Sequence, residues 1–384
     1  MPGILVLNAG SSSLKFALFD AGLNELHRGS VTEVGGAARV EAGGVSHDCD
    51  APDHEAALAQ CLSALNHLGV SLSDLTAAAH RVVHGGANLT QPCRITPDAE
   101  AAIAACIPLA PLHNPHNLAA IRAMARLAPD LPQTASFDTA FHATNPGVAL
   151  RYAIPKALHD AGIRRYGFHG ISYASLAARL PALTGQPLPR RLLALHLGNG
   201  ASLCAILDGR SVATTMGYSP LDGLTMGTRA GGIDGNAVLA VADRIGPEAA
   251  ARVLNRESGL LALGGASDMR ALRADTRPQA AFAVAHFCYW AVRHAGSMIA
   301  AMGGLDALVF TGGIGEHDAR TRAEIVAGLG WAGAVLDADA NAIHRTALHA
   351  SGGCVTVWRV PAEEERRIAE DALALLGVGG TGKS

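Results

Sequence analysis

The sequence predicts an α/β protein made of two similar halves, and two observations carry this prediction. Short apolar runs rich in strand-forming residues alternate with alanine-rich stretches of helical spacing. The pattern of strand, tight turn and strand also occurs twice, near the N-terminus and close to the middle of the chain. The 384 residues are enough for two domains of ordinary size.

The repeated pattern indicates an internal duplication. Each copy consists of an apolar run, a turn-forming cluster and a second apolar run: Gly3–Leu7, Asn8–Ser13 and Leu14–Phe19 in the first copy, and Leu192–Leu197, Gly198–Ser202 and Leu203–Leu207 in the second. Aligning Ser13 on Ser202 gives an offset of 189 residues, close to half of the chain. An offset of that size favours a duplicated domain over chance similarity.

The remaining elements follow from periodicity and from proline positions. The strands expected elsewhere in the chain are Ala77–Val83, Thr134–Phe137 and Ala307–Thr311. The expected helices are Asp98–Cys106, Asn117–Leu127, Pro278–Met302 and Glu363–Leu376. Two sheets covered by helices would face each other across a cleft, which is a preferred place for a ligand.

Composition limits the possible partners. The formal net charge is −3, so the chain has no basic field to attract nucleic acid or an anionic membrane. No apolar stretch reaches the roughly 18 residues that a membrane span needs. The seven cysteines are odd in number and form no C-x-x-C pair, and the N-terminus lacks the pattern of a signal peptide. We therefore expect a cytoplasmic protein in a reducing compartment, with small-molecule partners.

The two predicted hairpins are candidate phosphate sites. The turn Asn8–Lys15 offers adjacent backbone N–H groups, three hydroxyls and an ammonium, and its small residues let the backbone approach an anion. The turn His196–Gly200 has similar properties. Taken alone, a Ser- and Gly-rich hairpin without any ligand remains an alternative.

Charged residues at strand ends and in glycine-rich loops are further candidates. Arg81 ends an apolar strand, where a guanidinium can hold a carboxylate or phosphate bidentately, or can be an ordinary surface residue. Asp138 directly follows a strand, where it can serve catalysis or metal binding, or can cap a helix. His169 and Arg229 lie in glycine-bounded loops and can stabilise phosphoryl charge, or can be ordinary loop residues.

Two glycine-rich segments resemble nucleotide-binding turns. Phe310–Glu316 follows a strand and opens onto a helical stretch, so that it can bind nucleotide, although tight packing explains it equally well. Gly377–Ser384 matches the P-loop pattern G-x-x-x-x-G-K-[ST]. Because a helix precedes it and the sequence stops at Ser384, we expect a flexible tail there and no P-loop.

Taken together and in order, these segments resemble the acetate kinase family of the acetate/sugar kinase, Hsc70 and actin superfamily. The resemblance runs from Gly3 to about Ala374. The matching stretches are Asn8–Lys15, His80–Gly86, Pro108–Pro115, Phe137–His142, Gly167–Gly170, His196–Gly200, Met226–Arg229 and Thr311–Glu316.

The resemblance implies a two-lobed, duplicated actin-like ATPase fold with a βββαβαβα core in each lobe and a central cleft. The N-terminal lobe would comprise residues 1–142 and 366–384, and the C-terminal lobe residues 143–365. The implied activity is reversible, direct in-line transfer of the γ-phosphoryl group of ATP to acetate, giving acetyl phosphate and ADP. The implied cofactor is Mg²⁺, for which Mn²⁺ would substitute, and the implied assembly is a homodimer.

The resemblance also implies a role for individual residues. Asp138 would be catalytic, and His169 and Arg229 would stabilise the transferring phosphoryl group. Asn8 and Glu364 would place the metal ion. The acyl substrate would be bound by Arg81, Val83, Leu112, His113, Phe168 and Pro220. ATP would be bound by Ser11, Ser13, Lys15, His196, Leu197, Gly198, Asn199, Gly200, Asp268, Met269, Arg270, Gly313, Ile314, Gly315, Glu316 and His317.

The chain departs from the family pattern at a few positions. After Gly170 the family commonly has Thr-Ser-His, whereas this chain has Ile171, Ser172 and Tyr173. A tyrosine can donate a hydrogen bond but cannot become cationic. The usual Pro-Thr-Asn-Glu-Glu appears as Pro-Ala-Glu-Glu-Glu at Pro361–Glu365, and this altered stretch contains Glu364, the expected metal partner.

Two alternative functions remain at this stage. Propionate or butyrate kinase activity on the same scaffold is the nearer one, because one methylene in an apolar pocket changes binding by only about 1–3 kcal/mol. A nucleotide-dependent chaperone or filament protein of the same superfamily is the more distant one. It would need a peptide-binding domain or polymer-forming loops, for which the 384 residues leave no room.

Overall fold

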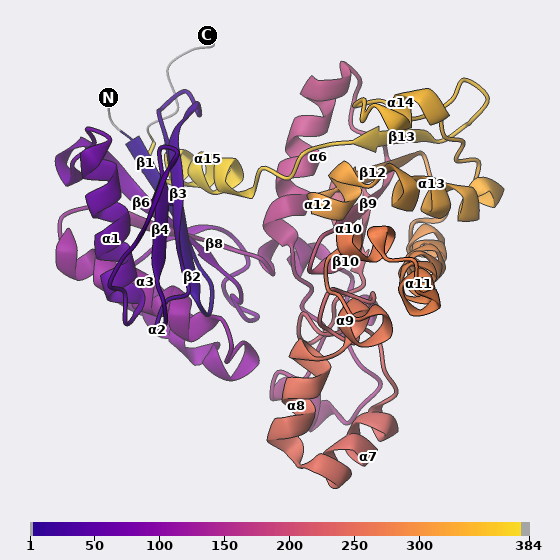
Figure 1. The fold of residues 1–384 in the computed structure, drawn as a ribbon, viewed down its shortest axis with the longest axis horizontal. Helices are drawn as coiled ribbons and strands as arrows, with labels where there is room; N and C mark the ends of the chain where they lie inside the picture. The colour runs from indigo at the N-terminus through magenta and orange to yellow at the C-terminus, as the bar shows by residue number, and fades with distance from the viewer. Residues whose placement is uncertain (1–2, 378–384) are drawn as a thin grey trace. The chain divides into compact units, whose positions relative to one another are not determined.

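The computed structural model describes residues 3–377, which divide into two compact units. Unit 1 contains the described residues of 1–141, 170–175 and 363–384, and unit 2 contains residues 142–169 and 176–362. Each unit has its own β-sheet with helices packed against it (Figure 1). The lobe boundaries expected after residues 142 and 365, and the cleft expected between the lobes, stay predictions.

Unit 1 is built on an eight-stranded sheet of order β5-β4-β3-β2-β1-β6-β8-β7. Strand β1 runs antiparallel to β2 and parallel to β6, and β6 runs parallel to β8. The strands are β1 (Gly3–Ala9), β2 (Ser13–Phe19), β3 (Glu25–Thr32), β4 (Arg39–Ala42), β5 (Val45–Asp48), β6 (Leu75–Val82), β7 (Cys93–Arg94) and β8 (Gln133–Phe137).

Unit 2 is built on a five-stranded sheet of order β11-β10-β9-β12-β13. Strand β9 runs antiparallel to β10 and parallel to β12, and β12 runs parallel to β13. The strands are β9 (Arg191–Leu197), β10 (Ala201–Leu207), β11 (Arg210–Thr214), β12 (Ala307–Thr311) and β13 (Thr356–Arg359).

The two sheets share one topology. The order β3-β2-β1-β6-β8 in unit 1 corresponds to β11-β10-β9-β12-β13 in unit 2. In each sheet the first three strands of this order run antiparallel, each to the next, and the last two run parallel to the third strand, which is β1 or β9. This correspondence confirms the duplicated α/β fold predicted from the repeated hairpin.

Both faces of β1 are buried, which explains why its residues from Ile4 to Leu7 are all apolar. Leu5 and Leu7 point to one face and pack with α1 and α3, whereas Ile4 and Val6 point to the other face and pack with α15. In Figure 1, α15 lies on the opposite side of β1 from α1 and α3. The C-terminal helix is therefore part of the core of unit 1.

Local signals set the helix ends. The carboxylate of Asp53 caps α1, Pro278 occupies the first turn of α11, and Gly303 ends α11 with φ of +69°. The helices that pack in unit 1 are α1 (His54–His67), α2 (Pro97–Ala105), α3 (Asn114–Leu127) and α15 (Glu364–Leu376). Helix α6 (Gly170–Thr184) begins in unit 1 and ends in unit 2.

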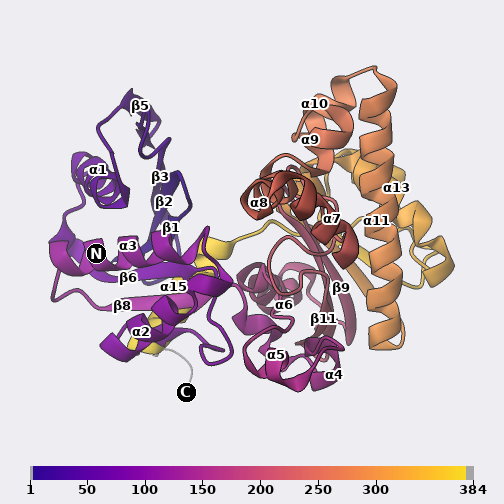
Figure 2. The ribbon, with the colours of Figure 1, turned by 90° about the horizontal axis from the view of Figure 1, so that it is seen from below.

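The long helix α11 (Pro278–Met302) packs along the sheet of unit 2, beside β9, β10 and β11 (Figure 2). The other helices of unit 2 are α4 (Gly147–Leu150), α5 (Lys156–Asp160), α7 (Gly235–Ile245), α8 (Pro247–Arg256), α9 (Gly259–Gly264), α10 (Met269–Ala274), α12 (Gly312–His317), α13 (Ala319–Gly328) and α14 (Ala338–Ala342). In the described part of the chain, no helix combines the length and hydrophobicity that a bilayer crossing requires.

The individual element predictions agree with this architecture. Each predicted strand and helix is present within one or two residues, except that α3 begins at Asn114, three residues before the expected start. Strands β3 to β5, β7, β11 and β13 were not predicted, nor were several helices, among them α1 and α6. Of the expected flexible tail, Gly377–Ser384, only Gly377 belongs to the described residues.

Candidate active-site residues

Arg81 and Asp138 meet at the carboxyl ends of two neighbouring parallel strands of unit 1. Arg81 precedes the last residue of β6, Asp138 directly follows β8, and Val82 lies opposite Phe137 in the register. Nε of Arg81 donates to Oδ1 of Asp138 at 3.0 Å, and Nη2 donates to Oδ2 at 2.7 Å. Both carboxylate oxygens therefore bind the guanidinium, which is the bidentate geometry that arginine favours.

On its other side, Arg81 lies near Asn8 and Glu364. Nη1 of Arg81 donates to Oδ1 of Asn8 at 3.4 Å and lies 4.0 Å from Oε2 of Glu364. Burial raises the pKa of Glu364 to about 7, an effect that Arg81 opposes and Asp138 adds to. Although burial works against a charged arginine, the Asp138 and Glu364 carboxylates raise the pKa of Arg81 above its ordinary value. The guanidinium thus stays cationic between two acidic groups.

Asn8 and Glu364 have the donor chemistry that Mg²⁺ prefers. An amide oxygen and a carboxylate are hard oxygen donors, and Mg²⁺ usually binds few protein groups because it keeps waters and substrate phosphates. Among residues 3–377, no three His, Cys, Asp or Glu side chains gather into a complete cage. A cation beside Glu364 would favour its ionised form and so offset the cost of burial. The residues therefore fit the expected ion.

The first predicted phosphate hairpin presents its polar groups to solvent. Its turn is closed by a hydrogen bond from Gly10 N to Ser13 O at 2.8 Å. Ser11 and Lys15 are exposed and Ser13 is half-buried, and Lys15 stands opposite Asn8 in the β1–β2 register. The hydroxyls and the ammonium are thus accessible on the same hairpin as the proposed metal partner Asn8.

In unit 2, four predicted residues gather at the second hairpin. The ring of His169 stacks on that of His196 with 4.2 Å between centroids, and Nδ1 of His169 lies 2.9 Å from Oγ of Ser202. A β-carbon at Gly200 would lie 3.2 Å from Nε2 of His169 and 3.5 Å from Nη1 of Arg229. Glycine therefore lets both side chains approach the turn. His169 itself has φ of +59°, which is uncommon for a residue with a side chain.

The loop that carries Arg229 is held against the same hairpin. Gly227 N donates to Asn199 O at 3.0 Å, and the Asn199 side chain occupies the space that a β-carbon at Gly227 would need. Nη1 of Arg229 donates to Pro220 O at 3.2 Å. Backbone contacts thus fix the predicted phosphoryl-stabilising arginine next to Leu197–Gly200.

The predicted nucleotide turn forms the short helix α12 at the end of β12. Strand β12 pairs with β9, so that Thr311 lies opposite His196. Oε1 of Glu316 accepts from Gly312 N at 3.0 Å and from Ala362 N at 2.9 Å, which ties the turn to the chain after β13. The remaining predicted members differ in exposure, with Gly313 and His317 exposed, Ile314 half-buried and Gly315 buried.

Arg322, a residue not predicted from the sequence, lies fully buried beneath this turn. Its Nη1 donates to the carbonyls of Gly315 and Glu316, both at 2.9 Å, and its Nε donates to Oδ1 of Asn341 at 2.7 Å. Burial lowers the pKa of Arg322 to about 10. The sequence offers one sign of this role, an arginine on the inward face of α13. Its partner Asn341 is too distant in the sequence to be recognised from it.

The segment Asp268–Arg270 is used mainly within its own helix. The Asp268 carboxylate accepts from the backbone of Arg270 and Ala271 and so caps α10. The hydrogen bond from the Arg270 side chain, together with these backbone bonds, lowers the pKa of Asp268 to about 2. Met269 is buried, whereas the Arg270 side chain is 91% exposed. Of the three, Arg270 has the side chain most accessible to a ligand.

The predicted acyl-binding residues are divided between the units. Val83, Leu112 and His113 belong to unit 1, and Phe168 and Pro220 to unit 2. Val83 is buried and Leu112 is 42% exposed, while Phe168 is almost fully buried. Their joint role as a pocket wall stays a prediction.

The departures from the family pattern after Gly170 have packing roles. Ile171 belongs to the core between the sheet of unit 1 and α15. Tyr173 is fully buried. A buried aromatic residue at this position contributes apolar area and no charge.

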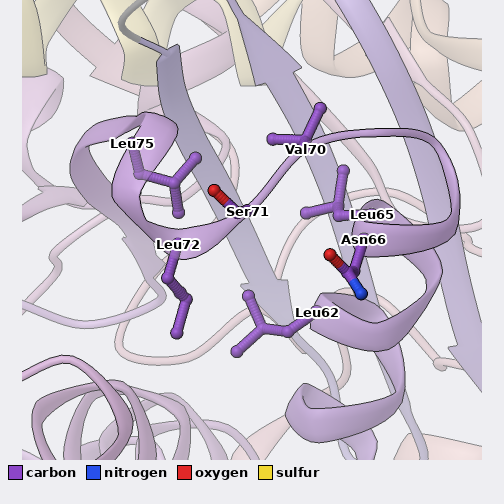
Figure 3. A pocket seen from close by; sticks show the side chains of 7 residues that line it. All are labelled: Leu62, Leu65, Asn66, Val70, Ser71, Leu72 and Leu75. Carbon is purple, nitrogen blue, oxygen red and sulfur yellow. The ribbon is translucent and has the colours of Figure 1, made fainter.

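A separate pocket in unit 1 lacks the chemistry of these sites. It has a volume of about 240 Å³ and is lined by Leu62, Leu65, Asn66, Val70, Ser71, Leu72 and Leu75. Figure 3 shows mainly aliphatic side chains around it and no charged group. It adjoins the first residue of β6, whereas Arg81 lies near the last. This pocket is not the candidate active site.

The fold and these side chains define a class of protein. It is a duplicated α/β phosphotransferase in which cationic side chains lie at strand ends and in glycine-rich turns. More specifically, the chain belongs to the acetokinase family, whose model matches residues 3–370.

Known relatives agree with this assignment. The chain is 44% identical to an acetate kinase of Rhodopseudomonas palustris, over 95% of this chain and 96% of that protein. The structure resembles that of Porphyromonas gingivalis acetate kinase, with a TM-score of 0.91 and 34% identity over 98% and 100% of the two chains. It also resembles a propionate kinase from Francisella tularensis, with a TM-score of 0.92 and 35% identity over 97% and 99%.

Proposed function

We propose that this protein is an acetate kinase, which transfers the γ-phosphoryl group of ATP reversibly to acetate and yields acetyl phosphate and ADP. The observation that carries the proposal is the partly buried Arg81–Asp138 pair flanked by Asn8 and Glu364. An arginine at this position can bind a carboxylate through Nη1, because Asp138 already occupies its Nε and Nη2 edge. Membership of the acetokinase family supports the same reaction.

The chemistry requires charge neutralisation more than a strong base. Acetate already carries its nucleophilic oxygen as an anion, and the difficulty is to bring it to an anionic phosphate. We propose that Arg81 binds the carboxylate and that Asp138 holds Arg81 and aligns the reacting groups. His169 and Arg229 would stabilise the phosphoryl group during direct in-line transfer. Inversion of configuration at phosphorus is expected, and retention would contradict a direct transfer.

The nucleotide would be bound by glycine-rich turns and polar side chains of both units. In unit 1 the proposed ATP contacts are Ser11, Ser13 and Lys15, which are accessible on the first hairpin. In unit 2 they are the residues of the second hairpin and of the turn after β12, together with Arg270. The stacked rings of His169 and His196 support a shared phosphate site there.

We propose that the enzyme requires Mg²⁺, with Mn²⁺ as a substitute, held by Asn8 and Glu364. When bound, the ion neutralises phosphate charge and orients the phosphates. Asn8 contributes an amide oxygen and Glu364 a carboxylate whose ionised form Arg81 favours.

The decisive experiment is an acyl-hydroxamate assay with purified protein, ATP and MgCl₂. Acetate is expected to give acetyl hydroxamate, with the rate lost when EDTA removes the metal. ATP hydrolysis without acyl phosphate would instead favour a nucleotide-dependent chaperone or filament protein.

Propionate kinase activity is a second candidate, favoured by the structural likeness to the propionate kinase from Francisella tularensis. Comparing kcat/KM for acetate, propionate and butyrate in the same assay distinguishes the two. We expect acetate to be preferred and propionate to be used at a measurable rate, because a single methylene changes kcat/KM by roughly 10–200-fold.

We also propose a cytoplasmic homodimer. ATP is the proposed co-substrate, and all seven cysteines are unpaired, which suits a reducing compartment. Phe282 and Tyr289 are 59% and 63% exposed and lie seven residues apart on α11, so they share one face of that helix. Trp331, 68% exposed, lies beside Gly296 on the same helix. An aromatic stripe of this kind supports a partner surface.

A further inference from the structure

The loop that follows Arg81 is shaped by side chains and not by sheet or helix hydrogen bonds. Four consecutive backbone N–H groups, from Val83 to Gly86, each donate to a side-chain acceptor. The acceptors are Asn117 Oδ1 at 3.1 Å, Asn114 Oδ1 at 3.1 Å, Thr139 Oγ1 at 3.1 Å and His84 Nδ1 at 2.9 Å. Burial lowers the pKa of His84 to about 4, so its ring stays neutral and able to accept.

Two of these acceptors come from one face of α3. Asn114 and Asn117 lie three residues apart and are 0% and 1% exposed. Buried polar groups of this kind are costly unless every donor and acceptor has a partner. The oxygen of each amide is used by the loop after Arg81, so the amide nitrogens must be bonded elsewhere.

The amide nitrogens of the two asparagines have different targets. Nδ2 of Asn117 donates at 2.9 Å to the carbonyl of Ala9, the residue after Asn8 in the first hairpin. Nδ2 of Asn114 donates to the carbonyls of His84 at 3.0 Å and Ile103 at 3.3 Å. Asn117 therefore joins the hairpin to the Arg81 loop, whereas Asn114 joins that loop to α2 and makes no contact with the hairpin.

We propose that Asn117 and Asn114 are positioning residues, of which Asn117 sets the metal- and phosphate-binding hairpin in register with the Arg81 loop and Asn114 sets that loop for the carboxylate substrate. This inference rests on the proposed function. A single fully buried amide holds Ala9 and Val83 at fixed separation, and so holds Asn8 relative to Arg81. Misplacement of such groups by about 1 Å can lower a rate by about 100-fold.

The same substitution at both positions separates the two roles. Asn117→Asp and Asn114→Asp each keep an oxygen for the loop N–H but replace the donating nitrogen with a second acceptor that faces a carbonyl. N117D is expected to raise KM for both MgATP and acetate, each by about tenfold or more. N114D is expected to raise KM for acetate by a similar factor and to leave KM for MgATP within about twofold of the wild type. Initial rates in the hydroxamate assay give both constants.

The split between the constants excludes a merely structural effect. Partial unfolding reduces the active fraction, which lowers kcat and leaves KM unchanged. Asn66→Asp is the matched control, because Asn66 is exposed on α1, and it should leave both constants unchanged. If N117D does not fold, Asn117→Ser removes both bonds without adding charge and should raise both KM values.

The outcomes also separate this inference from the proposed function. A wild-type protein that forms no acyl phosphate contradicts the proposed function itself. An active wild type with unchanged KM values in N117D and N114D would overturn the inference alone. Equal changes of KM for MgATP in the two variants would also overturn it, because only Asn117 contacts the hairpin.

Discussion

Asp138 occupies the Nε and Nη2 edge of Arg81, which leaves Nη1 as the group of that guanidinium that faces Asn8 and Glu364. The pair links the ends of β6 and β8 and makes the arginine both a structural and a binding element. Its two contributions, to activity and to stability, can be separated by substitution.

Replacing Arg81 should abolish most activity. Arg81→Lys keeps a charge but loses the bidentate geometry, and kcat/KM for acetate is expected to fall by about 10²-fold or more, as for loss of one electrostatic donor. Arg126→Lys is the matched control, because Arg126 forms an exposed pair with Glu55, and should be nearly neutral. Steady-state kinetics at saturating ATP check both variants.

Arg81→Ala should also lower the free energy of unfolding. Asp138 is 2% exposed and would be left charged and unpaired, at a cost of about 3 kcal/mol. The double variant Arg81→Ala, Asp138→Asn should recover stability in urea without recovering activity. Recovery of both would show that the pair has no role in catalysis.

The dependence of stability on pH should report the buried carboxyl of Glu364. Its pKa is raised from 4.5 to about 7, chiefly by burial, so the folded state binds a proton that the unfolded state has already released between these values. The free energy of unfolding should therefore fall as pH rises from about 4.5 to about 7, by roughly 3 kcal/mol at most from this group, and then level off.

Urea denaturation without Mg²⁺ checks this expectation. Glu364→Gln should remove most of the fall and should be more stable than the wild type at pH 8. The same substitution at Glu248, which is exposed on α8, should leave the profile unchanged. An E364Q profile that superimposes on the wild type would mean that this carboxyl titrates normally.

Much of the fold could be predicted because its signals are local. The run Gly3–Leu7, the turn after it and Pro278 at the start of α11 each determine structure within a few residues. Strands β3 to β5 could not be predicted, because Glu25–Thr32 is half-exposed and polar and is held in the sheet by pairing with β2. Their stability comes from the neighbouring strand and not from their own composition.

The site shows the same limit. Arg81 and Asp138 could each be proposed from their place at a strand end, but their pairing depends on the parallel register of β6 and β8. The roles of Asn114 and Asn117 depend on backbone groups far away in the sequence, such as Ala9. Glu316 and Asp268 were expected at ATP, and the structure shows that their carboxylates also hold backbone N–H groups.

A small side chain at Gly200 should disturb the phosphate site of unit 2. A β-carbon there would lie 3.2 Å from His169 Nε2, closer than most such contacts, and 3.5 Å from Arg229 Nη1, an ordinary contact distance. Gly200→Ala is expected to lower kcat about tenfold or more with little change in the thermal midpoint, because the neighbours are side-chain ends that can move. Gly147→Ala, with open space around it, is the control. A wild-type kcat in G200A would argue against close approach of the two side chains to the reacting phosphoryl group.

The aromatic stripe on α11 should determine the oligomeric state. Phe282 and Tyr289 expose large apolar areas on one helix face, and burying them against a second copy would be favourable by roughly 1.5–3 kcal/mol for each large side chain. The double variant Phe282→Asp, Tyr289→Asp should convert a dimer of the wild type into a monomer in light scattering coupled to size exclusion. Val148→Asp is the control, because Val148 is 90% exposed on a different helix and should not affect the state if it lies outside the interface. A wild type that is monomeric at micromolar concentration, or a dimer that survives both charges, would remove α11 as the partner surface.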